Sequence, residues 1–291
     1  MKKCPLCNSS QKKNLWHNKV WGGKKNDKFL HCMNCDIVYL YPFPSQKKVA
    51  KFYQNNFGTY MQERSKEINW KNLKKQYDNL YKRELPLRSV FLNKYLKKGN
   101  VCDVGCSTGF TLDYISKYKT NQTYGVEPSL EHIKFINPKH KIYRDISDIN
   151  LMFDNILHYY VLEHVFNPLD FLSNLIKRLK KNGRMIFEIP NRNDALFSLY
   201  KIESYKDFIM QKMHLFYFSE KSINYILNKF KIKYKIFRCQ RYNFDNHFNW
   251  ISNNKVNPQF NFFSTKLNKL YMNEICQKKF NDHFTIVLTK I

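Results

Sequence analysis

The sequence predicts an α/β fold built on a doubly wound, mostly parallel sheet. The first observation behind this prediction is that short apolar runs alternate with segments of helical spacing over residues 99–191. Such alternation is typical of a parallel sheet with helices on both faces. The second observation is a length of 291 residues with 43% hydrophobic residues, which suits one large α/β domain with small attachments.

The N-terminal part of the chain carries two pairs of cysteines, Cys4 with Cys7 and Cys32 with Cys35. Four thiolates on two tight turns complete a tetrahedral metal site, so this spacing predicts a structural zinc ion with no open coordination position. A segment of about 40 residues buries too little apolar surface to fold alone, and a metal ion would stabilise it. We expect a zinc ribbon over residues 1–45.

Residues 46–98 are rich in lysine and have helical spacing. A long apolar stripe from Leu73 to Leu92 is interrupted by Pro86, which removes a backbone donor and disfavours a continuous helix. We expect helices that lead into the sheet and cover its ligand site, with a break at the proline.

A loop with small residues at alternate positions follows the first strand of the expected sheet. It contains Asp103, Gly105, Ser107 and Gly109, and the residues after it have helical spacing. Glycine lets the backbone turn sharply and approach a ligand without a Cβ in the way. A strand, such a loop and a helix in succession are typical of nucleotide-binding sheets.

The second strand, predicted over residues 123–126, ends in Glu127. An acid about 20 residues beyond such a loop is the usual partner of ribose hydroxyl groups. The loop and this acid together resemble motif I and the following acidic position of class I S-adenosylmethionine-dependent methyltransferases, although Ser107 replaces a glycine usual in that family. The resemblance implies that the donor S-adenosylmethionine is bound by Asp103, Gly105, Ser107, Gly109 and Glu127.

Further donor contacts follow from the same resemblance. Asp145, after the third strand, would accept a hydrogen bond from the adenine amino group, and Ile146 would pack on the ring; an ordinary loop acid is the alternative. Tyr160 ends the fourth strand at a position where many relatives carry histidine. The run Val161–Val165, with Pro168 and Ile189-Pro190-Asn191 further on, resembles the VLEHV…P…PN signature of small-molecule methyltransferases.

This resemblance covers residues 99–240 and implies a Rossmann-like, seven-stranded sheet. The last strand, predicted over residues 284–288, would insert antiparallel between strands five and six. We therefore expect a methyltransferase domain over residues 99–291, with insertions at residues 192–219 and 240–281.

An N-terminal four-cysteine ribbon joined to this core is similar to methyltransferases of sugar-nucleotide and surface-polysaccharide pathways. The resemblance implies methyl transfer to a small, phosphorylated or sugar-nucleotide acceptor in capsule or surface-polysaccharide synthesis. Sugar C-methyltransferases usually carry a further large C-terminal domain that this length does not accommodate, which argues against C-methylation.

The two insertions are expected to build the acceptor site, and residues 192–213 of the first are expected to form a lid over the donor. The second contains the polar and aromatic run 240–250, which resembles a segment of some zinc-ribbon methyltransferases; a hydrogen-bonded structural corner is the alternative. The predicted acceptor-binding residues are Arg241, Tyr242 and Asn246. Arg241 would suit a phosphate group of the acceptor.

Methyl transfer to a hydroxyl group needs a base, and histidine has a suitable pKa. The candidates, in order, are His247, His214 and His164. His247 is placed first because it lies on an insertion beside polar residues.

A net charge of +27 favours partners that are polyanions, so RNA methylation is the alternative function. The excess lysines are evenly spread, and a solvated background charge explains them equally well. The Asn/Asp-Pro-Pro-aromatic motif of base-amine methylation is missing from the end of strand four, which argues against RNA. A silent binding protein is disfavoured because Gly105, Gly109 and Glu127 are all present.

No apolar run approaches the about 18 residues that span a bilayer, and no secretory signal follows the N-terminus. We expect a cytoplasmic protein without a transmembrane segment, and the sequence does not indicate its oligomeric state.

Overall fold

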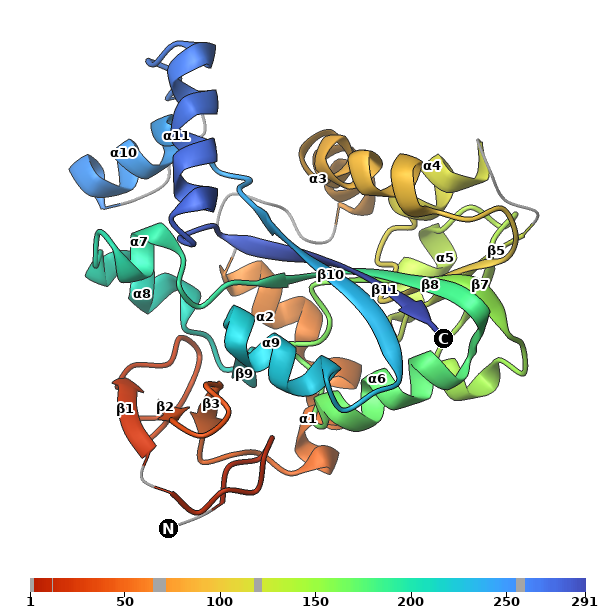
Figure 1. The fold of residues 1–291 in the computed structure, drawn as a ribbon, viewed down its shortest axis with the longest axis horizontal. Coiled ribbons are helices and arrows are strands. Elements are labelled where there is room, and N and C mark those ends of the chain that lie inside the picture. Colours follow the sequence, from red (N-terminus) through yellow and green to blue (C-terminus); the bar gives the residue numbers. More distant parts are fainter. Residues whose placement is uncertain (1–2, 12, 65–71, 118–121, 255–259) are drawn as a thin grey trace.

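The computed structural model describes residues 3–11, 13–64, 72–117, 122–254 and 260–291. A seven-stranded sheet in the order β10-β11-β8-β7-β4-β5-β6 crosses the molecule (Figure 1). Its strands are β4 (Val101–Val104), β5 (Thr123–Val126), β6 (Lys141–Tyr143), β7 (Phe153–Tyr159), β8 (Leu179–Pro190), β10 (Ile232–Cys239) and β11 (His283–Lys290). The strands from β6 to β8 are parallel, and β11 is antiparallel to both β8 and β10. The predicted sheet, with its last strand inserted antiparallel, is confirmed.

The register of the central strands brings three loops together. Val104, the last residue of β4, pairs with Val126 of β5 and with His158 of β7. The loops that leave the carboxyl ends of these parallel strands therefore begin side by side. Ligands of doubly wound sheets bind at this edge.

Helices cover both faces of the sheet (Figure 1). They include α3 (Leu73–Tyr95) and α4 (Phe110–Ser116) on one face, and α6 (Pro168–Lys177) and α9 (Glu220–Leu227) on the other. The Asn167 side chain caps α6, because it accepts hydrogen bonds from the backbone N–H groups of residues 169 and 170. The Ser219 side chain caps α9, where it accepts a hydrogen bond from the backbone N–H of Ser222.

The predicted break at Pro86 is wrong. α3 continues through this residue, since a proline removes only one helical hydrogen bond while Leu85 and Leu92, one on each side of it, are buried. α6 stops at Lys177, and Asn182, which adopts a left-handed φ of 59°, lies inside β8.

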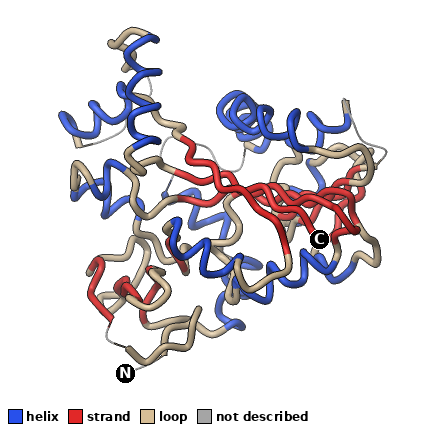
Figure 2. Tube along the Cα trace, viewed as in Figure 1, coloured by secondary structure: helices blue, strands red, loops and turns tan. Residues whose placement is uncertain are grey.

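The N-terminal ribbon contains the strands β1 (Lys13–His17), β2 (Lys28–Cys32) and β3 (Val38–Tyr41). Its sheet has a fourth strand, β9 (Phe216–Tyr217), which comes from the predicted insertion 192–219. Figure 2 shows this small sheet apart from the large one. Because β9 belongs to the chain that leaves β8, the ribbon is attached directly to the segment that follows the active edge of the sheet. The divisions at residues 45 and 98 stay predictions.

The remaining helices are α1 (Gln46–Asn55), α2 (Phe57–Arg64), α5 (Leu130–Phe135), η1 (Ile146–Asp148), α7 (Ala195–Ser198), α8 (Glu203–Ile209), α10 (Phe244–Asn253) and α11 (Thr265–Gln277). α7, α8 and β9 lie within the insertion 192–219, and α10 and α11 within the insertion 240–281. Among the described residues, none of the helices combines the length and the apolar character needed to cross a membrane.

Candidate active site and metal centre

The loop between β4 and α4 has the backbone conformation that its glycines predict. Gly105, Ser107 and Gly109 have φ values of 78°, 50° and 76°, all in the left-handed region. A Cβ on Gly105 would lie 2.6 Å from a methyl group of Val161, so only glycine fits there without a shift. Ser107 adopts the same kind of conformation with a side chain present, which explains how it can occupy a position usually held by glycine.

Glu127 is fixed against this loop by backbone donors. Its two carboxylate oxygens accept hydrogen bonds from the N–H groups of Ser107 and Ser129, each at 2.9 Å. Burial raises the pKa of Glu127 to about 7, although the two backbone hydrogen bonds act in the opposite direction. The carboxyl group is therefore held rigidly at the carboxyl end of β5 and titrates near neutral pH.

A cavity of about 860 Å³ opens at this edge of the sheet. The predicted donor-binding residues that line it are Asp103, Gly105, Ser107, Glu127, Asp145, Ile146 and Tyr160. Its volume falls within the range of small-molecule sites. Asp103 Oδ1 is buried without a hydrogen-bond partner in the described part of the chain, and burial raises the pKa of this carboxyl group to about 7. The glycine cradle and this unpaired oxygen fit a bound S-adenosylmethionine.

Asp145 has a structural role as well as its place at the cavity. One carboxylate oxygen accepts hydrogen bonds from the backbone N–H and the hydroxyl group of Ser147, at 2.8 and 2.7 Å, and so caps η1. The structure thus contains both features that the sequence left open, a loop cap and a cavity-lining acid.

Arg241 lines the cavity, but its charge is already neutralised. Its guanidinium group lies 2.8 Å from a carboxylate oxygen of Glu84, contacts the Tyr160 hydroxyl group and covers the Tyr160 ring at 4.8 Å. Arg88 pairs similarly with the buried Glu188, at 3.1 Å. Tyr242 also lines the cavity, whereas Asn246 is not among the described residues that do so.

The structure does not bring His247 to the cavity. Its ring is fully buried between α10 and α11, with Nδ1 2.6 Å from the Tyr271 hydroxyl group and Nε2 3.3 Å from the Gln240 amide. Burial lowers the pKa of His247 to about 4. Its polar neighbours form the structural corner that was the alternative interpretation of this segment.

His164 and His214 do line the cavity, together with Glu163. The imidazole rings lie 4.7 Å apart edge to face, and each of the three residues places one possible ligand atom within 4.8 Å of the others. Such a group could hold a metal ion. Both Glu163 oxygens and His214 Nδ1 are buried without a hydrogen-bond partner in the described part of the chain.

The hydrogen bonds assign the protons of the two histidines. His164 Nδ1 lies 3.0 Å from the Met213 carbonyl oxygen, so this nitrogen donates and Nε2 carries the lone pair. His214 Nε2 lies 2.9 Å from the amide nitrogen of Gln211, whose oxygen accepts from Tyr60, so His214 Nε2 accepts and its proton is on Nδ1. Burial lowers the pKa of His164 to about 4 and raises that of Glu163 to about 8.

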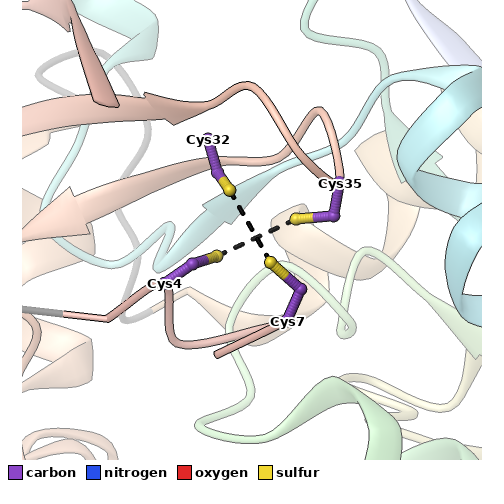
Figure 3. Close-up of side chains that lie close together, drawn as sticks. All are labelled: Cys4, Cys7, Cys32 and Cys35. Carbon is purple, nitrogen blue, oxygen red and sulfur yellow. Dashed lines mark hydrogen bonds between the residues drawn. The ribbon is translucent and has the colours of Figure 1, made fainter. Parts of the chain in front are cut away.

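The four cysteines of the ribbon meet at one point (Figure 3). The sulfur atoms of Cys4 and Cys35 lie 3.8 Å apart, and those of Cys7 and Cys32 lie 3.7 Å apart. All four sulfur atoms lie within 4.8 Å of one another, as ligands of one metal ion would. The predicted cysteine cluster is therefore present, and its chemistry suits zinc.

Sequence reasoning missed several residues that line the cavity. Glu163 lies inside the quoted VLEHV run, and its place beside His164 at the end of a strand was a signal that could have found it. Glu84 and Arg88 lie in the middle of α3 and carry no local signal. Arg192 and Asp194 follow the predicted Pro190-Asn191 strand end, where only the position at the active edge of the sheet points to them.

Solved structures share this fold at low sequence identity. A methyltransferase in complex with the Haloferax volcanii Trm112 methyltransferase activator superposes with a TM-score of 0.52 at 11% identity, over 74% of this chain and 93% of that one. The plantazolicin methyltransferase BamL, in complex with a triazolic desmethylPZN analog and SAH, gives 0.50 at 12% identity, over 84% and 99%.

Curated relatives match a shorter part of the chain. The ubiquinone biosynthesis O-methyltransferase of Rickettsia akari (strain Hartford) is 28% identical over 153 residues, which is 45% of this chain and 59% of that protein. A protein-family profile described as a methyltransferase domain matches residues 70–231, more than half of the chain. The chain therefore belongs to this methyltransferase domain family and carries a class I S-adenosylmethionine-dependent methyltransferase domain.

Proposed function

We propose that the protein transfers the methyl group of S-adenosylmethionine to a hydroxyl group of a small, phosphorylated or sugar-nucleotide acceptor in surface-polysaccharide synthesis. The observation that carries the proposal is that one cavity joins the donor loop to the Glu163–His164–His214 group. Donor and proton acceptor can therefore face the same substrate. The ribbon resemblance supports a sugar-linked acceptor.

The donor supplies an activated methyl group, and the protein has to orient it. Gly105 and Ser107 allow close backbone approach, while Glu127 is aimed by its two backbone hydrogen bonds to accept from the ribose hydroxyl groups. Asp103 has an unpaired oxygen for the donor's amino acid end. These groups hold the donor in one pose, and alignment supplies much of the catalysis in such a reaction.

His164 replaces His247 as the first choice for the base. Its Nε2 lone pair lies within the cavity group, whereas the accepting nitrogen of His214 already takes a hydrogen bond from Gln211. Glu163 Oε1 lies 3.9 Å from His164 Nε2. When Glu163 is ionised, it stabilises the imidazolium that forms as His164 takes the acceptor's proton.

The four-cysteine cluster is proposed to bind one structural zinc ion on Cys4, Cys7, Cys32 and Cys35. Four thiolates leave no open coordination position, so such an ion orders the ribbon and takes no part in methyl transfer. Metal analysis of the purified protein should give one zinc per chain.

A mass-spectrometric screen tests the proposed function. Purified protein and S-adenosylmethionine are incubated with nucleotide sugars, sugar phosphates, glycan extracts and RNA, and products are searched for a gain of about 14 Da per transferred methyl group. We expect the gain on a nucleotide sugar or sugar phosphate. A gain on RNA alone would contradict the proposal and favour the alternative that the net charge of +27 suggests.

A further inference from the structure

Three arginines that line the cavity keep buried guanidinium nitrogens without a hydrogen-bond partner in the described part of the chain. These nitrogens are Nε and Nη1 in Arg192, and Nε in Arg64 and Arg241. Arg241 already contacts the buried carboxylate of Glu84, whereas two nitrogens of Arg192 are unpaired. Buried unpaired donors cost free energy that a bound acceptor oxygen would recover.

Arg192 is fixed where the chain leaves β8. It is only 8% exposed, and its backbone N–H donates to the Phe218 carbonyl oxygen at 2.8 Å. Nη2 donates to Asp36 Oδ1 at 2.7 Å, and the guanidinium group lies over the Trp16 ring at 4.7 Å. Both side-chain partners belong to the ribbon, so the ribbon sets the orientation of this cavity arginine.

Asp36 directly follows Cys35 of the metal cluster. Its carboxylate also lies 2.8 Å from His31 Nε2 and accepts a hydrogen bond from the Ser219 hydroxyl group at 2.5 Å. Asp36 therefore links the cysteine cluster to Arg192 through these contacts.

Arg64 supplies a second positive charge to the cavity. One terminal nitrogen donates to the Phe208 carbonyl oxygen at 3.2 Å, and the guanidinium group lies 4.4 Å from the centre of the Phe208 ring. No carboxylate of the described residues forms an ion pair with it. Arg64 lacks an anionic partner among the described residues, and Arg192, although it is paired with Asp36, keeps Nε and Nη1 for the oxygen atoms of a ligand.

Acids also line the cavity. Glu84 and Asp282, whose pKa values are lowered, are each paired with a cationic side chain, Glu84 with Arg241 and Asp282 with His283. Burial raises the pKa of Asp103, Glu127 and Asp194 to about 7, so these carboxyl groups are only partly ionised at neutral pH.

We propose that Arg192, with Arg64 as a second cation, binds an oxyanion of the acceptor, and that the four-cysteine ribbon orients Arg192 through Asp36. The ligand group is a phosphate or a carboxylate, because a guanidinium group presents its donors in a fork that matches two such oxygens. The inference rests on the proposed function, since the anion is part of the methylated acceptor. It transfers the phosphate-binding role predicted for Arg241 to Arg192.

Calorimetric titration of the full chain, saturated with S-adenosylhomocysteine, tests the proposal. Inorganic phosphate and acetate are titrated separately at constant ionic strength into wild type and Arg192→Gln. We expect the anion that binds wild type to bind Arg192→Gln at least about tenfold more weakly. The matched control is Arg144→Gln, an exposed arginine of the same cavity, which should change the affinity by less than about twofold.

Binding of phosphate alone, or of acetate alone, identifies the group. No binding of either anion by wild type, or equal affinity in wild type and Arg192→Gln, would overturn the proposal. The affinity for S-adenosylhomocysteine reports whether each variant is folded. If the Arg192→Gln variant no longer binds S-adenosylhomocysteine, the double variant Asp36→Asn/Arg192→Gln is used in its place, because it removes both charges of the pair.

Two outcomes would distinguish a failure of the proposed anion site from a failure of the proposed function. Anion binding that depends on Arg192, with no small molecule methylated in the screen, would refute the function and leave the site. A methylated sugar phosphate whose KM is the same in wild type and Arg192→Gln would refute the site and leave the function.

Discussion

The proposed donor end and the proposed acceptor end of the cavity are built in different ways. At the donor end, one short loop and an acid that follows it by 20 residues provide Gly105, Ser107 and Glu127, and backbone N–H groups aim the carboxylate. At the proposed acceptor end, side chains come from α2, the loop after β7 and the segment after β8. One of them, Arg192, is held by Asp36 of the ribbon, 156 residues away in the sequence. Local backbone geometry therefore defines the first end and tertiary packing the second.

The largest effect is expected at the acceptor end. His164→Ala should lower turnover by about 10²–10⁴, because proton removal belongs to the transition state. Donor affinity should change little, since the donor loop does not contact this ring. Turnover is measured with the acceptor found in the screen, and donor affinity by calorimetry. The control is the His140→Ala variant, which should keep turnover close to that of wild type. His140 is a buried histidine that is hydrogen-bonded to Thr123 and Asp113.

Full turnover in the His164→Ala variant would show that His164 is not the base.

The next effect probes the backbone of the donor end. Gly105→Ala places a Cβ at a φ of 78° and 2.6 Å from Val161, a strain of about 1–3 kcal/mol that should weaken donor binding about tenfold to hundredfold. Gly58→Ala is the control, because a Cβ there meets nothing within 4 Å. Calorimetry with S-adenosylhomocysteine measures both. Equal affinities in the two variants would show that the loop conformation does not define the donor end.

A smaller effect with a pH signature is expected at Glu127. Glu127→Gln should weaken donor binding about tenfold at pH 8, because neutral acceptors form weaker hydrogen bonds with ribose hydroxyl groups. The pKa of about 7 means that the wild-type carboxyl group loses its charge as pH falls from 8 to 6. Wild-type affinity should thus fall toward that of the variant at low pH, while the variant stays flat. If the affinities of wild type and Glu127→Gln change with pH in the same way, the result would argue against a contact between Glu127 and the ribose.

The smallest effect on activity is expected at His247. His247→Ala should leave turnover within about twofold of wild type, yet lower the free energy of unfolding by about 1–3 kcal/mol, because it removes a buried ring and its hydrogen bonds to the Tyr271 hydroxyl group and the Gln240 amide. Thermal unfolding and turnover are measured on the same preparation. A large loss of turnover without a loss of stability would return His247 to the acceptor site.

The same contrast explains what could be predicted from the sequence. The sheet, the donor loop and the cysteine cluster were predictable, because each depends on residues a few positions apart and on rules of local geometry. His247 was misleading because a dense set of polar and aromatic residues marks a buried structural corner as well as a binding site. Asp36 and Arg192 could not be paired, since only the fold brings the ribbon against the end of β8.

The helix around Pro86 also shows that tertiary contacts can outweigh a local sequence rule. The sequence predicted a break there, yet α3 stays continuous because buried contacts on both sides outweigh one lost hydrogen bond. The helix positions Glu84 and Arg88 at the cavity, and neither could be assigned a role before their partners Arg241 and Glu188 were known.

The division of the cavity into two ends is tested most directly by removing the metal cluster. Cys32→Ser should lose bound zinc and weaken binding of the Arg192-dependent anion about tenfold, because Asp36 is no longer held in place. S-adenosylhomocysteine should bind within about threefold of wild type, as should both ligands in the control Cys239→Ser, a cysteine outside the cluster. Both ligands are titrated into each protein in one calorimetric series. Parallel loss of donor and anion binding, or unchanged anion binding without zinc, would contradict the account.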